Sequence, residues 1–170
     1  MNFSFSAMAA TAALIIFPTV GLTNEIHTPT GPVVLTIKGN ISKTNVGDAM
    51  ELDYSMLSSL PSVSFETSTI WTEGVSEFTG IPLAALLDYV DADGHTIKAY
   101  AINDYAVQLP IEGLTESYPI VAFQKDNEEM TVRSKGPLWI VYPFDSSADL
   151  QTETVYARSI WQLNKLEILD

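Results

Sequence analysis

Residues 63–90 read VSFETSTIWTEGVSEFTGIPLAALLDYV and contain the clearest secondary-structure signals in the chain. In residues 63–71 apolar and polar side chains partly alternate, which predicts a β-strand. Residues 81–90 form the strongest predicted helix, because Pro82 suits a first turn and Gly94 lies beyond the expected end. Between these two elements stands Trp71-Thr72-Glu73-Gly74, which we expect to be a loop.

Working outward, the rest of the chain predicts more short strands and one more helix. Apolar residues recur at helical spacing between Asp53, the expected N-cap, and Pro61, which stops the helix. The closing segment 158–168 fits either a strand or a short helix. Further strands are predicted at 33–37, 97–102, 105–109, 119–123 and 138–142. This pattern predicts a single α+β domain that is rich in β-structure.

The composition excludes several chemistries. The chain has 170 residues, with 8 Lys and Arg, 21 Asp and Glu, no cysteine and 2 histidines. Its formal charge of −13 argues against nucleic acid or anionic lipid as a partner, because both need a basic surface. Without cysteine there is no disulfide, thiolate nucleophile, zinc–thiolate site or thiolate-bound molybdenum. No histidine lies near Ser134 in the sequence to activate it, so we predict no catalytic residue and no enzyme.

The N-terminal segment has the pattern of a secretory signal peptide. Residues 7–17 (AMAATAALIIF) are uncharged and apolar, and small or helix-breaking residues follow them. The run is too short for a membrane-spanning helix, which needs about 20 apolar residues. Residues 1–6 carry no Lys or Arg, which departs from the usual signal, and an N-terminal anchor or a buried strand is the alternative. We expect residues 1–23 to be the signal and 24–170 to be an exported, periplasmic domain without a membrane insertion.

Three clusters of aromatic and polar residues lie at predicted strand ends or in loops, where binding sites are common. The clusters are Trp71-Thr72-Glu73-Gly74, Asn103-Asp104-Tyr105 and Arg133-Ser134-Lys135-Gly136-Pro137-Leu138-Trp139. Core packing, turn formation and surface charge are the structural alternatives for them. By spacing alone they predict a polar pocket with aromatic walls. The candidate ligand-binding residues are Trp71, Thr72, Glu73, Asn103, Asp104, Tyr105, Arg133, Lys135 and Trp139.

Five segments in order resemble the sulfite-oxidase-type molybdopterin-binding domain. They read VVLTIKGNI, IWTEGVSEFTGIPLAALL, AINDYAVQLP, VRSKGPLWIVYP and WQLNKLEI, and together they extend over most of residues 33–168. The motifs that carry the resemblance are Gly39, Trp71 before Phe78-Thr79-Gly80 and Leu83, Gly136-Pro137-Leu138, and Lys165-Leu166-Glu167-Ile168. The resemblance implies the sulfite-oxidase-like fold.

One departure from the family bears on function. The redox enzymes of the family bind molybdenum through a cysteine whose place here falls near Thr67, and a hydroxyl is a poor substitute for this soft ligand. The chain is similar to the short, exported, cysteine-free members, among them periplasmic pterin-response regulators. That similarity implies binding of a reduced pterin without molybdenum. It also implies contact with the periplasmic domain of an inner-membrane enzyme that makes or degrades cyclic di-GMP.

Two alternatives from other classes remain. One is a cofactor-carrying subunit or assembly factor of a molybdopterin oxidoreductase, which borrows a metal ligand from its partner. The other is an interaction protein whose inherited pocket is empty.

A pterin ring suggests a role for each candidate residue. Asp104, or else Glu73, could accept two parallel N–H bonds from the amide-and-amine edge of the ring. Asn103 could pair with a ring carbonyl or nitrogen. The basic pair in the third cluster, Arg133 and Lys135, suits a carbonyl oxygen or the phosphate of a larger pterin. Stacking on the ring is expected from one of three aromatic residues, Trp71, Tyr105 and Trp139.

Overall fold

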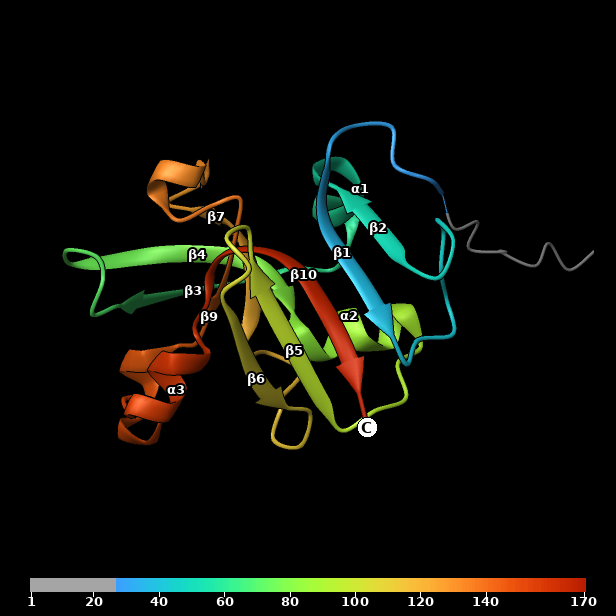
Figure 1. The fold of residues 1–170 in the computed structure, drawn as a ribbon. Helices are drawn as coiled ribbons and strands as arrows, with labels where there is room; N and C mark the ends of the chain where they lie inside the picture. The colour runs from blue at the N-terminus through green and yellow to red at the C-terminus, as the bar shows by residue number, and fades with distance from the viewer. Residues whose placement is uncertain (1–26) are drawn as a thin grey trace, which may run out of the picture.

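The structure, a computed structural model, describes residues 27–170, and the predicted signal segment 1–23 lies outside the described residues (Figure 1). The described chain is a β-rich α+β domain, as the sequence predicts. Its strands are β1 (Val33–Gly39), β2 (Met50–Asp53), β3 (Val63–Ser68), β4 (Val75–Pro82), β5 (Thr96–Ala101), β6 (Ala106–Pro110), β7 (Ile120–Lys125), β8 (Glu128–Glu129), β9 (Leu138–Val141) and β10 (Trp161–Leu169). Its helices are α1 (Tyr54–Ser59), α2 (Leu83–Val90), α3 (Glu153–Arg158) and the 3₁₀ turns η1 (Val132–Ser134), η2 (Phe144–Ser146) and η3 (Ala148–Leu150).

One branched sheet connects the strands, and β10 joins its two halves. The strand order is β2-β1-β10-β9-β7-β4-β3, while β5 also pairs with β10 and carries β6. The last strand pairs with β9 through Trp161 and Leu163, and with β1 from Lys165 onward. Among the described strands only the β1–β10 pair is parallel. The two halves of the sheet therefore meet where β10 changes partner.

Both predicted helices are confirmed, with local causes for their ends. The Asp53 carboxylate accepts the Met56 N–H at 2.9 Å, which caps α1, and Pro61 follows its C-cap residue. Helix α2 ends at Val90, and its C-cap residue Asp91 has a left-handed backbone. This helix buries Leu83, Leu86, Leu87 and Val90, the i, i+3, i+4 and i+7 pattern of a core-facing helix.

The predicted strands are confirmed with shifted ends, and the closing segment is the strand β10. The predicted strand 63–71 ends at Ser68, so Trp71-Thr72-Glu73-Gly74 lies in the loop before β4. The predicted helix 81–90 begins only at Leu83, because Ile81 and Pro82 pair with β7. Strands β2, β4 and β8 and helix α3 were not among the predicted elements.

Three glycines of the quoted sequence segments, Gly39, Gly80 and Gly136, lie where two backbones come close. A Cβ on Gly39 would collide with the Ile168 carbonyl, one on Gly80 with the Val121 carbonyl, and one on Gly136 with the Met130 carbonyl. These glycines therefore allow the close packing of the strands and loops around β10, β7 and β9. No helix within residues 27–170 is long and apolar enough to span a membrane.

Candidate functional site

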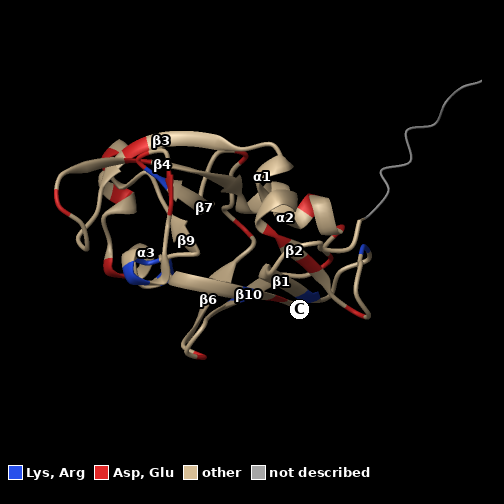
Figure 2. Ribbon diagram, turned by 90° about the horizontal axis from the view of Figure 1, so that it is seen from above, with Lys and Arg blue, Asp and Glu red and all other residues tan. Residues whose placement is uncertain are grey.

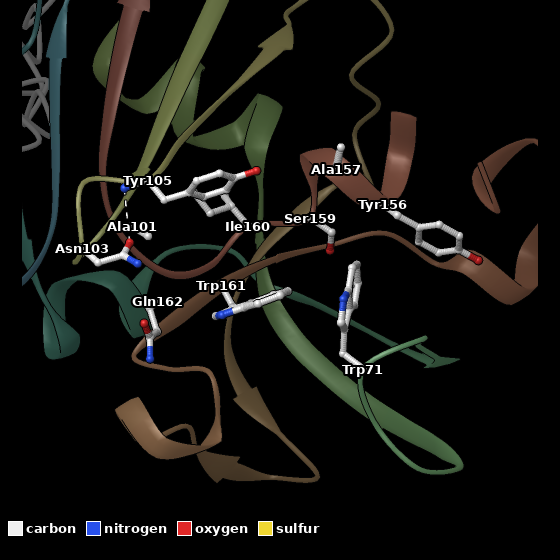
Figure 3. A pocket seen from close by; sticks show the side chains of 10 residues that line it. All are labelled: Trp71, Ala101, Asn103, Tyr105, Tyr156, Ala157, Ser159, Ile160, Trp161 and Gln162. Carbon is white, nitrogen blue, oxygen red and sulfur yellow. Dashed lines mark hydrogen bonds between the residues drawn. The ribbon is translucent and has the colours of Figure 1, made fainter. Parts of the chain in front are cut away.

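A cavity of about 410 Å³ opens beside the start of β10 (Figure 3). Four segments surround it: the loop before β4, the β5–β6 turn, helix α3 and the first residues of β10. Its volume falls within the range of roughly 300–1,000 Å³ that is typical of small-molecule sites. The lining residues are Trp71, Ala101, Asn103, Tyr105, Tyr156, Ala157, Ser159, Ile160, Trp161 and Gln162.

A bulge in β10 shapes the floor of this cavity. The register of β10 shifts across Gln162 against β9 and across Asn164 against β5, and the φ of Gln162, 52°, lies in the left-handed region. Such bulges re-aim side chains and are common next to sites. The Gln162 N–H donates to the Lys135 carbonyl and its carbonyl accepts from the Ile102 N–H, each at 2.9 Å. The bulge therefore brings the second and third predicted clusters to the same place.

Aromatic rings form the walls. The centroid of Trp71 lies 5.4 Å from that of Trp161 and 5.8 Å from that of Tyr156, in edge-to-face arrangements. The Tyr105 ring lies across the cavity from the Trp161 indole, and Trp71 stands at one end (Figure 3). With 59% of its surface exposed, Tyr105 leaves part of its ring open to contact with a ligand. This arrangement suits stacking of a planar ring.

The expected role of Trp139 in stacking is wrong, because its side chain is completely buried. Its indole lies behind Trp71 and Trp161, at centroid distances of 5.9 and 6.4 Å. The indole N–H donates to the Ser159 carbonyl at 3.2 Å. Trp139 therefore supports the aromatic wall from the core and offers no ring face to a ligand.

Two side-chain amides provide polar groups at the cavity. The Asn103 Oδ1 accepts the Tyr105 N–H at 3.2 Å, which leaves the Nδ2 group without an acceptor among the described residues. The Gln162 Nε2 donates to the Val132 carbonyl at 2.9 Å, and its Oε1 likewise has no donor in the described part of the chain. One amide thus offers a donor and the other an acceptor to a bound molecule.

The predicted carboxylate contact finds no support in this geometry. Asp104 and Glu73 are exposed, and neither lines the cavity. Asp104 sits in the β5–β6 turn with a left-handed φ of 64°, and its N–H donates to the Ala101 carbonyl. Asp104 therefore has a turn role in this structure, and the lining contains no carboxylate among the residues described.

Of the remaining candidates, one lies at the rim of the cavity and the others lie outside the cavity. Lys135 places its Nζ 4.6 Å from the Trp161 ring centroid, which is a cation–π contact with a residue of the wall. Arg133 is exposed in η1, and Thr72 hydrogen-bonds to Thr69 at 2.8 Å within the loop. Of the nine candidates, the structure places Trp71, Asn103 and Tyr105 at the cavity and Lys135 next to it.

Sequence reasoning missed most of the contribution from the chain's end. The missed lining residues are Ala101, Tyr156, Ala157, Ser159, Ile160, Trp161 and Gln162. A Trp-Gln pair at the start of a strand was a usable signal, because an aromatic residue next to an amide is a common composition of small-molecule sites. The bulge that turns Gln162 toward the loops has no signature in the sequence.

The position at which the resemblance places a metal-binding cysteine is occupied by Thr67, whose hydroxyl is part of the fold. Thr67 is completely buried on β3. Its Oγ1 accepts the Asp145 N–H at 3.1 Å and donates to the Ser68 carbonyl at 3.2 Å, which connects β3 to η2.

Tyr142 is a second buried hydroxyl. Burial raises the pKa of its phenol to about 12, so this group is a neutral donor at ordinary pH. Neither group lines the cavity.

The sequence matches no protein-family model and no curated protein. Among residues 27–170, no group of three or more His, Asp and Glu side chains is placed to hold a metal ion. The lining supplies aromatic surface and neutral hydrogen-bonding groups, which suit a planar, uncharged ligand.

Proposed function

We propose that this protein binds a reduced pterin in the cavity and reports its presence to a partner protein. The observation that carries the proposal is the combination of aromatic walls with two amides. Asn103 has a free N–H donor, and Gln162 has a free oxygen acceptor, among the described residues. A reduced pterin is flat, nearly uncharged at neutral pH, and bears both donors and acceptors at its edges. Its ring matches a site built for stacking and for neutral hydrogen bonds.

The lining suggests how the ring would lie. Tyr105 and Trp161 could hold its two faces, with Trp71 at one end. Asn103 would donate to a ring carbonyl or nitrogen, and Gln162 would accept from a ring N–H. Gln162 thus takes the acceptor role that the sequence assigned to Asp104. A neutral amide in place of a carboxylate favours a neutral ligand, because an uncompensated charge beside apolar walls is costly.

The finer family assignment is part of the same proposal. The order of the motifs supports a sulfite-oxidase-like scaffold, and the close backbone contacts at Gly39, Gly80 and Gly136 give those motif glycines a structural reason. Binding without molybdenum is supported by the absence of cysteine from the chain and by the engagement of Thr67 in the fold.

The location and partner follow from the resemblance. We propose that the domain acts in the periplasm, where it regulates a membrane-bound enzyme that makes or degrades cyclic di-GMP through that enzyme's periplasmic domain. Support comes from the motifs and from the signal-like pattern of residues 1–23. In this role the pterin is a signal, and the domain performs no chemistry on it.

A thermal-shift titration with tetrahydropterin and with oxidised pterin tests the proposal. A ligand that binds only the folded state at 100 times its Kd stabilises by about 2.7 kcal/mol, so the melting temperature should rise with tetrahydropterin. Tyr105→Ala should reduce this rise, whereas Val75→Ala, which also truncates an exposed apolar side chain, should leave it unchanged. No rise with any pterin would contradict the proposal. Stoichiometric molybdenum in the purified protein would favour the cofactor-carrying alternative instead.

A further inference from the structure

The open face of the sheet half β2-β1-β10-β5-β6 carries an unusual arrangement of lysines. Lys38 on β1, Lys165 on β10 and Lys98 on β5 lie on adjacent strands, in a chain with only 8 basic residues against 21 acidic ones. On each strand a residue next to the lysine, such as Ile37 beside Lys38, is buried in the core. Because successive side chains of a strand point to opposite faces, the lysines point away from the core. We call Lys38, Lys98, Lys165, Tyr100 and Glu167 the lysine face.

The strand register orders these side chains into two rows. Lys38 pairs with Glu167, and Glu167 pairs with Lys98, which makes one row across three strands. Lys165 pairs with Tyr100 in the neighbouring row. Because adjacent strands lie about 4.8 Å apart, the three ammonium groups share an area roughly 10 Å wide. Figure 1 shows β5 between β10 and β6, and Figure 2 shows β1, β10 and β6 on one side of the molecule, with α1 and α2 on the other side.

Two carboxylates lie on this face, Glu167 within the cluster and Glu51 on β2, which shares the row of Lys165 through Thr36, but they leave two of the lysines without a contacting carboxylate. Glu167 accepts the Tyr100 hydroxyl at 2.7 Å and pairs with the Lys38 Nζ at 3.3 Å, and these contacts hold its pKa below the usual value. Lys165 and Lys98 have no carboxylate partner within residues 27–170. Both place their Nζ over the Tyr100 ring instead, at 3.8 and 5.1 Å from its centroid. Each ammonium gains a cation–π attraction to this ring, but neither is in contact with a carboxylate of the described residues, so both can take a further anionic partner.

We infer that the lysine face binds an acidic segment of a partner protein. Carboxylates at alternate positions of an extended segment are about 7 Å apart and could reach Lys98 and Lys165 together. Charge complementarity at contact distance favours such a partner. A membrane or a nucleic acid is disfavoured because its extended anionic surface would also face the acidic residues around this small patch in a chain of charge −13, whereas a short acidic segment can contact the lysines alone.

The lysine face is continuous with the cavity through two strands. β5 carries Tyr100 and leads into the turn with Asn103 and Tyr105, and β10 carries Trp161 at the cavity and Lys165 on the face. A partner on this face would therefore contact the strands that position the ligand-binding residues. The acidic segment would belong to the partner protein of the proposed function, and in that respect the inference rests on that function. The arrangement of the lysines itself does not depend on a bound pterin.

An NMR titration with a dodecapeptide that alternates glutamate and threonine tests the inference. We expect salt-sensitive shifts in β1, β5 and β10, and at least tenfold weaker binding to the double variant Lys98→Gln, Lys165→Gln. Lys125→Gln, on β7, is the matched control and should bind as the wild type does. Equal binding to the double variant, or shifts confined to other strands, would overturn the inference.

Three further measurements separate the competing occupants and the proposed function. Sedimentation that shows self-association lost in the double variant would assign the face to a second copy and overturn the inference. Binding to phosphatidylglycerol vesicles but not to the peptide would overturn it as well. Repeating the titration with tetrahydropterin separates the two proposals: peptide binding without any pterin response supports the face and contradicts the proposed ligand.

Discussion

At the residue scale, Asn103 performs two tasks with one amide. Its Oδ1 holds the Tyr105 N–H in the β5–β6 turn, and its Nδ2 faces the cavity (Figure 3). The sequence assigns this residue to the site because a polar dipeptide precedes an aromatic residue between two strands. Asp104 beside it has the same sequence signal, yet its left-handed turn geometry keeps it out of the lining.

Asn103→Asp separates the two tasks. The carboxylate keeps an acceptor for the Tyr105 N–H but removes the donor that we assign to a ring acceptor. We expect tetrahydropterin to bind at least tenfold more weakly, about 1.4 kcal/mol, while the melting temperature changes little. Calorimetric titration of both proteins measures this. An unchanged Kd would remove Asn103 from the site.

Asp53 is a second residue with a defined electrostatic role. Its carboxylate accepts N–H bonds from Met56, Gly31 and Thr30, and these bonds hold its pKa below the usual value. Because the native pKa is lower than the unfolded value of about 3.9, the ionised carboxylate contributes its full stabilisation at any pH above that unfolded value. This contribution is lost as the pH falls through the native pKa.

Asp53→Asn should therefore lower stability most at neutral pH and flatten its acid dependence. The substituted amide keeps one acceptor for the cap but carries no charge. Urea unfolding of both proteins at several pH values below about 5 measures the difference between their slopes. Parallel pH profiles for the two proteins would show that Asp53 makes no linked contribution.

At the element scale, β10 decides where the site lies. The sequence predicts most strands because their β-branched and aromatic residues are grouped, and it predicts α1 and α2 because their caps and apolar spacing are local. The predictions miss β4, because this strand lies between the loop signal of Glu73-Gly74 and the helix signal at Pro82, and its last two residues were assigned to the helix. They also miss α3, which is held by the Thr152 cap and by packing of Tyr156 against Trp71. Pairing partners and bulges arise from tertiary contacts, so local patterns do not predict the bulge at Gln162, even though the Trp-Gln pair itself is visible in the sequence.

Gly80 shows how such contacts constrain an element. It lies at a register shift between β4 and β7, where a Cβ would meet the Val121 carbonyl and the Ala122 backbone. Gly80→Ala should cost about 1–3 kcal/mol in the free energy of unfolding, because the sheet would have to open. Gly31→Ala is the control, since its Cβ would meet only ordinary contacts with Asp53. Denaturant unfolding of both variants measures the costs, and equal small losses would mean that the β4–β7 contact is loose.

At the scale of the whole molecule, the charge imbalance is the dominant feature. The chain has a formal charge of −13, and residues 27–170 form only two ion pairs, Lys38 with Glu167 and Lys125 with Asp126. The acidic residues, red in Figure 2, occur in several separate loops and elements of the ribbon. Self-repulsion should therefore oppose folding more than ion pairs support it.

We expect added salt to stabilise the protein. Raising sodium chloride from about 0.01 M to about 0.15 M shortens the Debye length from about 30 Å to about 8 Å and screens this repulsion. Thermal unfolding at both concentrations should give a higher melting temperature at the higher one. A lower melting temperature in salt would mean that attractive pairs dominate.

The most direct test of ligand binding uses the indole N–H signals of the chain's 3 tryptophans. Trp71 and Trp161 line the cavity, whereas Trp139 is buried behind them. In a ¹⁵N–¹H spectrum titrated with tetrahydropterin, we predict large, saturable shifts for Trp71 and Trp161 and a smaller shift for Trp139. If none of the three indole signals moves at millimolar tetrahydropterin, the cavity does not bind this ligand and the proposed function is contradicted.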